Sequence, residues 1–67
     1  MANKILHYVG NDEYKSNTGH TVKREYGKTP NGNDLSGRWV FRNTKGEMKD
    51  FDQYRSDLAE RNHLELR

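Results

Sequence analysis

The hydrophobic and polar residues of the first part of the chain follow patterns typical of β-strands. Residues 4–9 are rich in β-branched and aromatic side chains, and the turn formers at 10–12 follow them, which predicts a strand and a turn. Residues 20–26 alternate more weakly, with Val22 and Tyr26 on one face. We therefore expect strands at 4–9 and 20–26, joined by a polar loop.

A β-hairpin is predicted in the middle of the chain. Residues 38–43 alternate, with Trp39 and Phe41 on one face of the expected strand. Gly46 follows in a tight turn, where a positive φ suits glycine, and residues 47–49 return as a short strand.

The last third of the chain carries a helical pattern, which predicts a helix over 51–62. Asp50 stands in the position of an N-cap, and Gln53 follows three residues later, as in a capping box. Leu64 and Leu66 then alternate, so the tail is either a last helical turn or a short strand. The predicted apolar stripe of the helix consists of Phe51, Tyr54 and Leu58.

These elements predict one small α+β domain over residues 1–67. A three- to four-stranded antiparallel sheet would pack against one C-terminal helix. Hydrophobic residues on the faces turned toward each other would form the core. The predicted core consists of Ile5, Val9, Val22, Tyr26, Trp39, Phe41, Met48, Phe51, Tyr54 and Leu58.

Composition narrows the classes of protein to be considered. The chain has 67 residues, of which 30% are hydrophobic and 33% charged, so its core is small. There is no cysteine, and the three histidines lack the paired spacing of zinc ligands, so we expect no disulfide, metal site or cofactor. The N-terminus lacks the long apolar run of a signal peptide or membrane span. We predict a cytoplasmic protein that does not contact a membrane.

Gly27, Lys28 and Thr29 resemble the end of a phosphate-binding loop, but the surroundings exclude that motif. The motif needs a glycine five residues before Gly27, where this chain has Val22. Pro30 also prevents the helix that must follow. These residues are therefore interpreted as a strand that runs into a turn.

Catalytic motifs are weak, and we predict that the protein is not an enzyme. Ser16, Ser36 and Ser56 lie outside any recognisable nucleophile elbow. His20 is more simply interpreted as a solvated residue at a strand edge than as a general base. No small-molecule substrate is indicated, because so small a domain encloses little space for a pocket.

The first functional hypothesis is protein binding. Leu6, Tyr8 and Val40 fall on the strand faces opposite the predicted core, where they would form an exposed apolar patch. Such a patch indicates a protein partner or a homodimer. On this hypothesis the protein is a small accessory or regulatory protein that acts through protein–protein contact.

The alternative hypothesis is DNA binding through the open face of the sheet. The net charge is +2, and a sheet with a basic open face and a helix behind it can enter a major groove. Interleaved acids at Glu25 and Glu47 also allow a simpler interpretation, a solvated face of mixed charge. The residues that would contact DNA are Lys23, Arg38, Arg42, Lys45 and Lys49.

Overall fold

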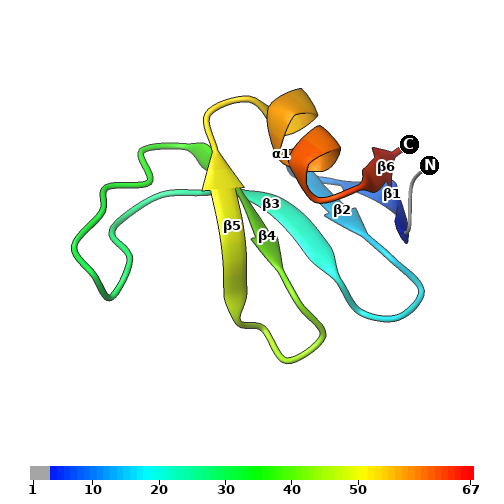
Figure 1. Cartoon of the computed structure of the whole chain (residues 1–67), viewed down its shortest axis with the longest axis horizontal. Helices are drawn as coiled ribbons and strands as arrows, with labels where there is room; N and C mark the ends of the chain where they lie inside the picture. Colours follow the sequence, from blue (N-terminus) through cyan, green and yellow to red (C-terminus); the bar gives the residue numbers. More distant parts are fainter. Residues whose placement is uncertain (1–3) are drawn as a thin grey trace.

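A computed structural model describes residues 4–67 of the chain. Within this range one short helix and six strands build the fold (Figure 1). In chain order the elements are β1 (Lys4–Gly10), β2 (Glu13–Lys15), β3 (Thr21–Glu25), β4 (Arg38–Arg42), β5 (Met48–Asp52), α1 (Arg55–Arg61) and β6 (Leu64–Leu66).

The strands form a single six-stranded sheet in the order β5-β4-β3-β2-β1-β6. Strands β1 to β5 follow one another as antiparallel neighbours, whereas β6 pairs with β1 in parallel. The sheet curls into a half-barrel, with α1 at one end of its concave side (Figure 1). The prediction of a three- to four-stranded antiparallel sheet is therefore wrong: the sheet is larger, mixed and curled.

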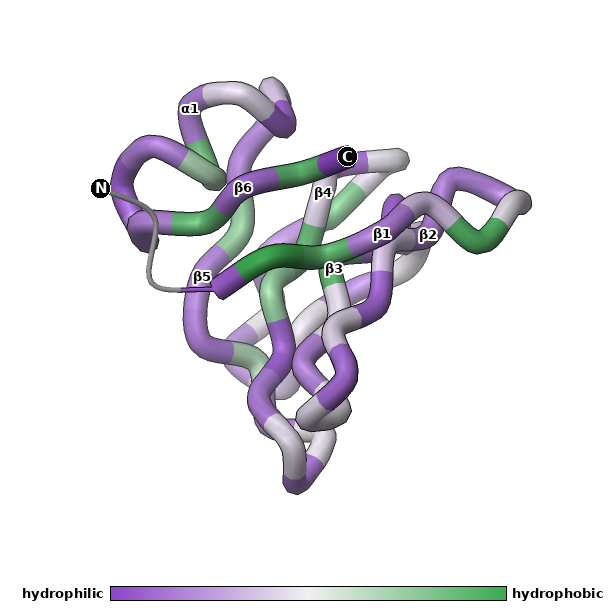
Figure 2. Tube along the Cα trace, turned by 90° about the vertical axis from the view of Figure 1, so that its right-hand side faces the viewer, coloured by the Kyte–Doolittle hydropathy of each residue, from purple (hydrophilic) through white to green (hydrophobic). Residues whose placement is uncertain are grey.

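The prediction lacked β2 and left β6 undecided, because both strands are only three residues long. In β2, Tyr14 is the single hydrophobic residue, so no alternating pattern is visible in the sequence. The tail 64–66 alternates, and the structure resolves the two alternatives in favour of a strand. Figure 2 shows β6 alongside β1, with hydrophobic and hydrophilic residues alternating along it.

The predicted helix 51–62 is too long, because its first residues belong to β5. Phe51 pairs with Val40 of β4, which extends the strand to Asp52. The helix begins at Arg55 after the N-cap residue Tyr54, which makes no side-chain capping hydrogen bond. The predicted capping box of Asp50 and Gln53 is therefore not formed.

The main core lies on the concave face of the sheet, beneath α1. Val22, Trp39, Phe41 and Leu58 are buried there, as predicted. The predicted burial of four other residues is wrong, since Ile5, Val9, Tyr26 and Tyr54 are exposed. Met48 and Phe51 are half-buried. The complete core cluster consists of Leu6, Tyr14, Val22, Trp39, Phe41, Leu58 and Leu64.

The assignment of faces failed in β1, where both faces carry hydrophobic residues. Leu6 pairs with Leu66 on the concave face and is fully buried, whereas Ile5 pairs with Glu65 on the opposite face. Sequence alternation alone does not say which of the two faces is covered. The N-terminal strand therefore contributes Leu6, not Ile5, to the core.

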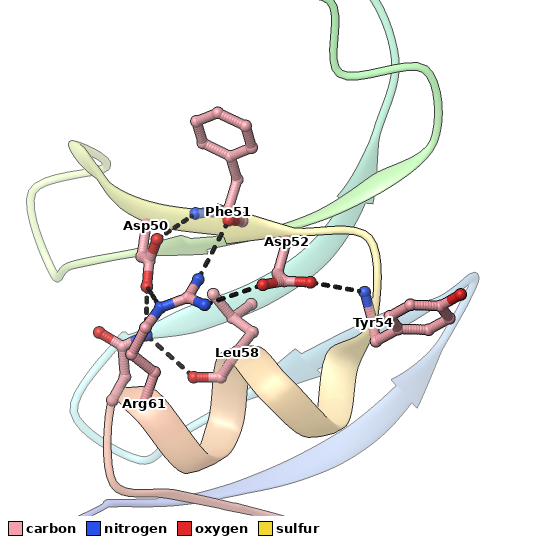
Figure 3. A network of polar contacts seen from close by, with 7 residues as sticks. Asp50, Phe51, Asp52, Tyr54, Leu58 and Arg61 are labelled. Carbon is pink, nitrogen blue, oxygen red and sulfur yellow. Dashed lines mark hydrogen bonds and ion pairs between the residues drawn. The ribbon is translucent and has the colours of Figure 1, made fainter.

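Phe51 also lies on the face opposite the main core. Its ring points away from Leu58 and α1, on the other side of β5 (Figure 3). It shares this outer face with its cross-strand partner Val40, which is fully buried. The expected packing of Trp39 and Phe41 against Phe51 and Tyr54 is thus wrong, and only the contribution of Leu58 is confirmed.

A polar network fastens α1 to β5 (Figure 3). The Arg61 guanidinium donates to Asp50 Oδ2 at 2.7 Å and to Asp52 Oδ2 at 2.8 Å, and it also reaches the Phe51 carbonyl. The hydrogen bond from Arg61 is the main cause that lowers the pKa of Asp50. The pKa of Asp52 is lowered chiefly by the Tyr54 N–H and secondly by Arg61. The two acids of β5 therefore hold α1 against the strand through Arg61, and neither of them caps the N-terminus of the helix.

Candidate anion-binding cleft

An open cleft of about 640 Å³ lies where the end of β3, the start of β4 and the connection from β5 to α1 meet. Three of its lining residues are arginines, and none of the described lining residues is acidic. We call it the arginine cleft. Its lining residues are Arg24, Ser36, Gly37, Arg38, Trp39, Gln53, Tyr54, Arg55 and Ser56.

The buried side chain of Trp39 lines the cleft, and the guanidinium groups of two of the arginines lie over its ring. Strand register places Arg24 of β3 directly beside Trp39 of β4 on the concave face. The Arg24 guanidinium carbon lies 5.5 Å from the Trp39 ring centroid, and that of Arg55, at the start of α1, lies 5.4 Å from it. Both distances are typical of cation–π contacts. The indole thus holds two cations from separate elements close together.

The charges of Arg24 and Arg55 are only weakly compensated. Across residues 4–67, Arg55 forms no ion pair with a carboxylate. Arg24 donates through Nε to the Gly37 carbonyl at 3.1 Å, and it forms an exposed ion pair with Asp12 at 3.7 Å. A pair of this length and exposure is worth little. The cleft therefore presents positive charge to a ligand.

Arg42 of β4 is closely paired with a carboxylate. It donates two hydrogen bonds to Glu25, both at 2.8 Å, from Nε and Nη2. This bidentate contact is the largest cause that lowers the pKa of Glu25. Arg42 is thus neutralised by a neighbouring strand, unlike the arginines of the cleft.

Arg38 contributes to the rim of the cleft. It precedes Trp39 in β4, so its side chain leaves the strand on the outer face. Its Nη1 donates to the Asp34 carbonyl at 2.9 Å, and no ion pair with a carboxylate is found for it among the described residues. The positive charge of the cleft therefore extends toward the loop before β4.

One exposed tyrosine lines the cleft, and a second lies over one of its lining residues. Tyr54 lines the cleft and is 60% exposed. Tyr26 is 72% exposed, and its ring lies over Gly37, where a Cβ atom would approach the ring carbon Cε1 to 3.0 Å. The positive φ of 82° at Gly37 favours glycine there, and an added Cβ would also press on the Tyr26 ring. The cleft thus combines weakly compensated cations with one exposed aromatic ring in its lining, that of Tyr54.

The residues predicted to form a protein-binding patch do not come together on the surface. Leu6 and Val40 are fully buried, on opposite faces of the sheet. Tyr8 is half-exposed on the concave side, where its ring packs edge-on against Tyr14. The expectation of an exposed apolar patch is wrong, because the face of β1 that carries Leu6 and Tyr8 is the face that packs inward.

The residues predicted to bind DNA fall into two groups. Register places Lys23, Arg38 and Arg42 on the outer face of β3 and β4, but Glu25 neutralises Arg42. Lys45 and Lys49 are exposed in and after the hairpin turn. Of the five residues, the structure brings only Arg38 to the cleft.

Sequence analysis missed Arg24 and Arg55 as site residues. Alternation along residues 20–26 puts Arg24 on the same face as Val22, but alternation within one strand gives no sign that Trp39 lies beside Arg24. Arg55 lies in the segment that was assigned to the middle of a helix. The only available signal was the neighbouring Tyr54-Arg55 pair, an aromatic residue beside a cation.

Other chemistry has less support in residues 4–67. No group of three or more potential metal ligands is found in this range. His20 Nδ1 lies 2.9 Å from the Thr18 hydroxyl, and its ring stacks on Phe41. None of the helices in this range is both long enough and apolar enough to cross a membrane.

Comparisons of the chain with protein-family models, curated proteins and solved structures found no match.

Proposed function

We propose that the protein is a small binding protein that recognises an anionic ligand through the arginine cleft. The observation that supports this most is the placement of Arg24 and Arg55 over Trp39 in one cleft, which also has Arg38 at its rim and whose described lining residues include no acid. Guanidinium groups recognise phosphate and carboxylate groups through directed, charge-assisted hydrogen bonds. We also propose a cytoplasmic location and a role without catalysis.

On this proposal the ligand binds at the arginine cleft and not on the open face of the sheet. On that face the carboxylate of Glu25 engages Arg42, and Glu13 lies across from Lys23. Mixed charge of this kind favours solvation over recognition of an anion. Contact with another protein, or with a second copy of the chain, stays the alternative proposal, but without the patch of Leu6, Tyr8 and Val40.

The test uses Trp39 as the reporter, because it is the single tryptophan of the chain. A ligand that draws Arg24 and Arg55 toward itself changes the surroundings of the indole and therefore its fluorescence. We expect inorganic polyphosphate to change this fluorescence in a saturable way, and the affinity to fall as salt is raised.

The matched variants each remove two positive charges. We expect the Arg24→Gln/Arg55→Gln double variant to bind polyphosphate on the order of tenfold more weakly, as the loss of charge-assisted hydrogen bonds implies. The Lys45→Gln/Lys49→Gln variant is the control, and isothermal titration calorimetry reports its affinity independently of Trp39. Equal losses in the two variants, or no binding by the wild type at low salt, would overturn the proposal.

A further inference from the structure

We infer that the ligand of the arginine cleft is single-stranded nucleic acid, held with an unpaired base stacked on Tyr54. This inference rests on the proposed function, since it names the class of anion that the cleft binds. The inference adds stacking of a base on Tyr54, which the binding of an anion by arginines does not require.

One aromatic ring in the lining of the cleft is exposed. Tyr54 is 60% exposed although it lines the cleft, so much of its ring is available to a ligand. Its backbone is fixed, because the Tyr54 N–H donates to Asp52 Oδ1 at 3.0 Å (Figure 3). An exposed ring on a fixed backbone is a suitable platform for a flat partner, and nucleobases stack on tyrosine in this way.

Arginines line the same cleft as Tyr54. Arg24 and Arg55 both lie over Trp39, at 5.5 and 5.4 Å from its centroid. Stacking on an aromatic ring uses the face of a guanidinium and leaves N–H groups at its edge for other partners. Phosphates of a nucleic-acid backbone are acceptors of the geometry that those groups bind. The cleft therefore offers cations for phosphates next to a ring for a base.

The size of the cleft favours a single strand over a duplex. A cleft of about 640 Å³ falls in the range of sites for small molecules, so it admits a nucleotide or two. The faces of bases are covered by their neighbours inside a duplex and are free only in an unpaired strand. An acidic peptide would satisfy the arginines but would leave Tyr54 without a stacking partner.

The experiment compares three fluorescently labelled DNA probes by fluorescence anisotropy at low salt. The first is a mixed-sequence single strand, the second an abasic strand of the same length and charge, and the third the corresponding duplex. We expect the single strand to bind on the order of tenfold more tightly than the abasic strand, as one stacked base implies. We expect the duplex to bind no more tightly than the abasic strand.

Two variants of one position separate stacking from structure. Tyr54→Ala should remove the preference for the base-bearing strand and leave the affinity for the abasic strand unchanged. Tyr54→Phe retains the ring, so it should retain the preference. If Tyr54→Ala weakens the binding of both strands equally, Tyr54 does not act through stacking and the inference is overturned.

The binding results also distinguish a failure of this inference from a failure of the proposed anion-binding function. Equal binding of the abasic and base-bearing strands would contradict the inference while leaving an anion-binding cleft intact. Tighter binding of the duplex than of the single strand would likewise contradict it. Failure of all three probes and of polyphosphate would overturn the proposed function together with the inference.

Discussion

Leu6 and Ile5 are neighbours in sequence, yet their side chains leave β1 on opposite faces. Leu6 is fully buried in the core cluster, whereas Ile5 is 42% exposed. Both are branched aliphatic residues in a strand whose two faces each carry hydrophobic residues, so hydrophobicity does not distinguish them. The distinction comes from β6, whose Leu66 covers one side while its Glu65 lies beside Ile5.

The two residues should therefore respond very differently to truncation. We expect Leu6→Ala to lower the free energy of unfolding by about 2–5 kcal/mol, because it leaves a cavity in the core. Ile5→Ala should cost about 1 kcal/mol or less, since it removes a partly solvated side chain. Urea unfolding of both variants measures the difference. Equal costs would show that the faces of β1 are wrongly assigned.

Gly37 and Gly46 form a second informative pair, because each has a φ of 82°. An added Cβ at Gly46 meets nothing within 4 Å, whereas at Gly37 it meets the Tyr26 ring at 3.0 Å. The positive φ at Gly46 was predicted from the hairpin turn and is confirmed. The requirement at Gly37 was not predicted, because it depends on a contact with Tyr26 outside any regular strand.

Alanine substitutions at the two glycines separate backbone strain from the tyrosine contact. We expect Gly46→Ala to destabilise the fold by about 1–2 kcal/mol through the left-handed backbone alone. Gly37→Ala should cost as much, and it should also displace Tyr26 and weaken ligand binding at the cleft. Thermal unfolding and polyphosphate titration of both variants provide the comparison. Unchanged binding by a folded Gly37→Ala protein would contradict this role of Gly37.

Among the elements, the hairpin β4–β5 was predicted well and the boundary between β5 and α1 poorly. Trp39, Val40 and Phe41 form a run of hydrophobic residues between Arg38 and Arg42, and a turn former follows at Gly46, so the strand and its turn are visible in the sequence. Phe51 and Leu58 happen to recur at helical spacing, although one belongs to a strand and the other to the helix. The pairing of Phe51 with Val40 overrides that local pattern.

The network between β5 and α1 makes the stability depend on pH. The pKa of Asp50 is lowered on folding, chiefly by Arg61, from an ordinary value of 3.8. A carboxylate whose pKa is lowered in the folded state contributes stability above its ordinary pKa. That contribution is lost as the pH falls through the lower, folded value. The network should therefore weaken as the solution is acidified below about pH 4.

Arg61→Gln tests this expectation. The variant should be less stable than the wild type at pH 7, and its stability should fall less between pH 5 and pH 2, because the pKa of Asp50 is no longer lowered by Arg61. Arg55→Gln is a suitable control, since no carboxylate pairs with Arg55 within residues 4–67. Urea unfolding across this pH range provides the measurement. Parallel pH curves for Arg61→Gln and the wild type would rule out the network as the source of the dependence.

At the scale of the whole molecule, both the sheet and the cleft depend on contacts that are remote in sequence. The edge pairing of Lys4 with Leu64 joins the two ends of the described chain, and no local pattern encodes such pairing. The cleft likewise assembles Arg24, Trp39 and Arg55 from β3, β4 and α1. Sequence alternation predicts which residues share a strand face, but the curl of the sheet decides which faces enclose a site.

The central claim is that ligands bind at the arginine cleft and not on the open face of the sheet. Two-dimensional ¹H–¹⁵N NMR of the labelled protein, titrated with the single-stranded DNA probe, tests this claim most directly. We expect the Trp39 indole N–H to shift progressively, together with the backbone amides of Arg24, Gly37, Tyr54 and Arg55. Shifts confined to Lys23, Lys45 and Lys49, with the Trp39 indole unmoved, would contradict the claim.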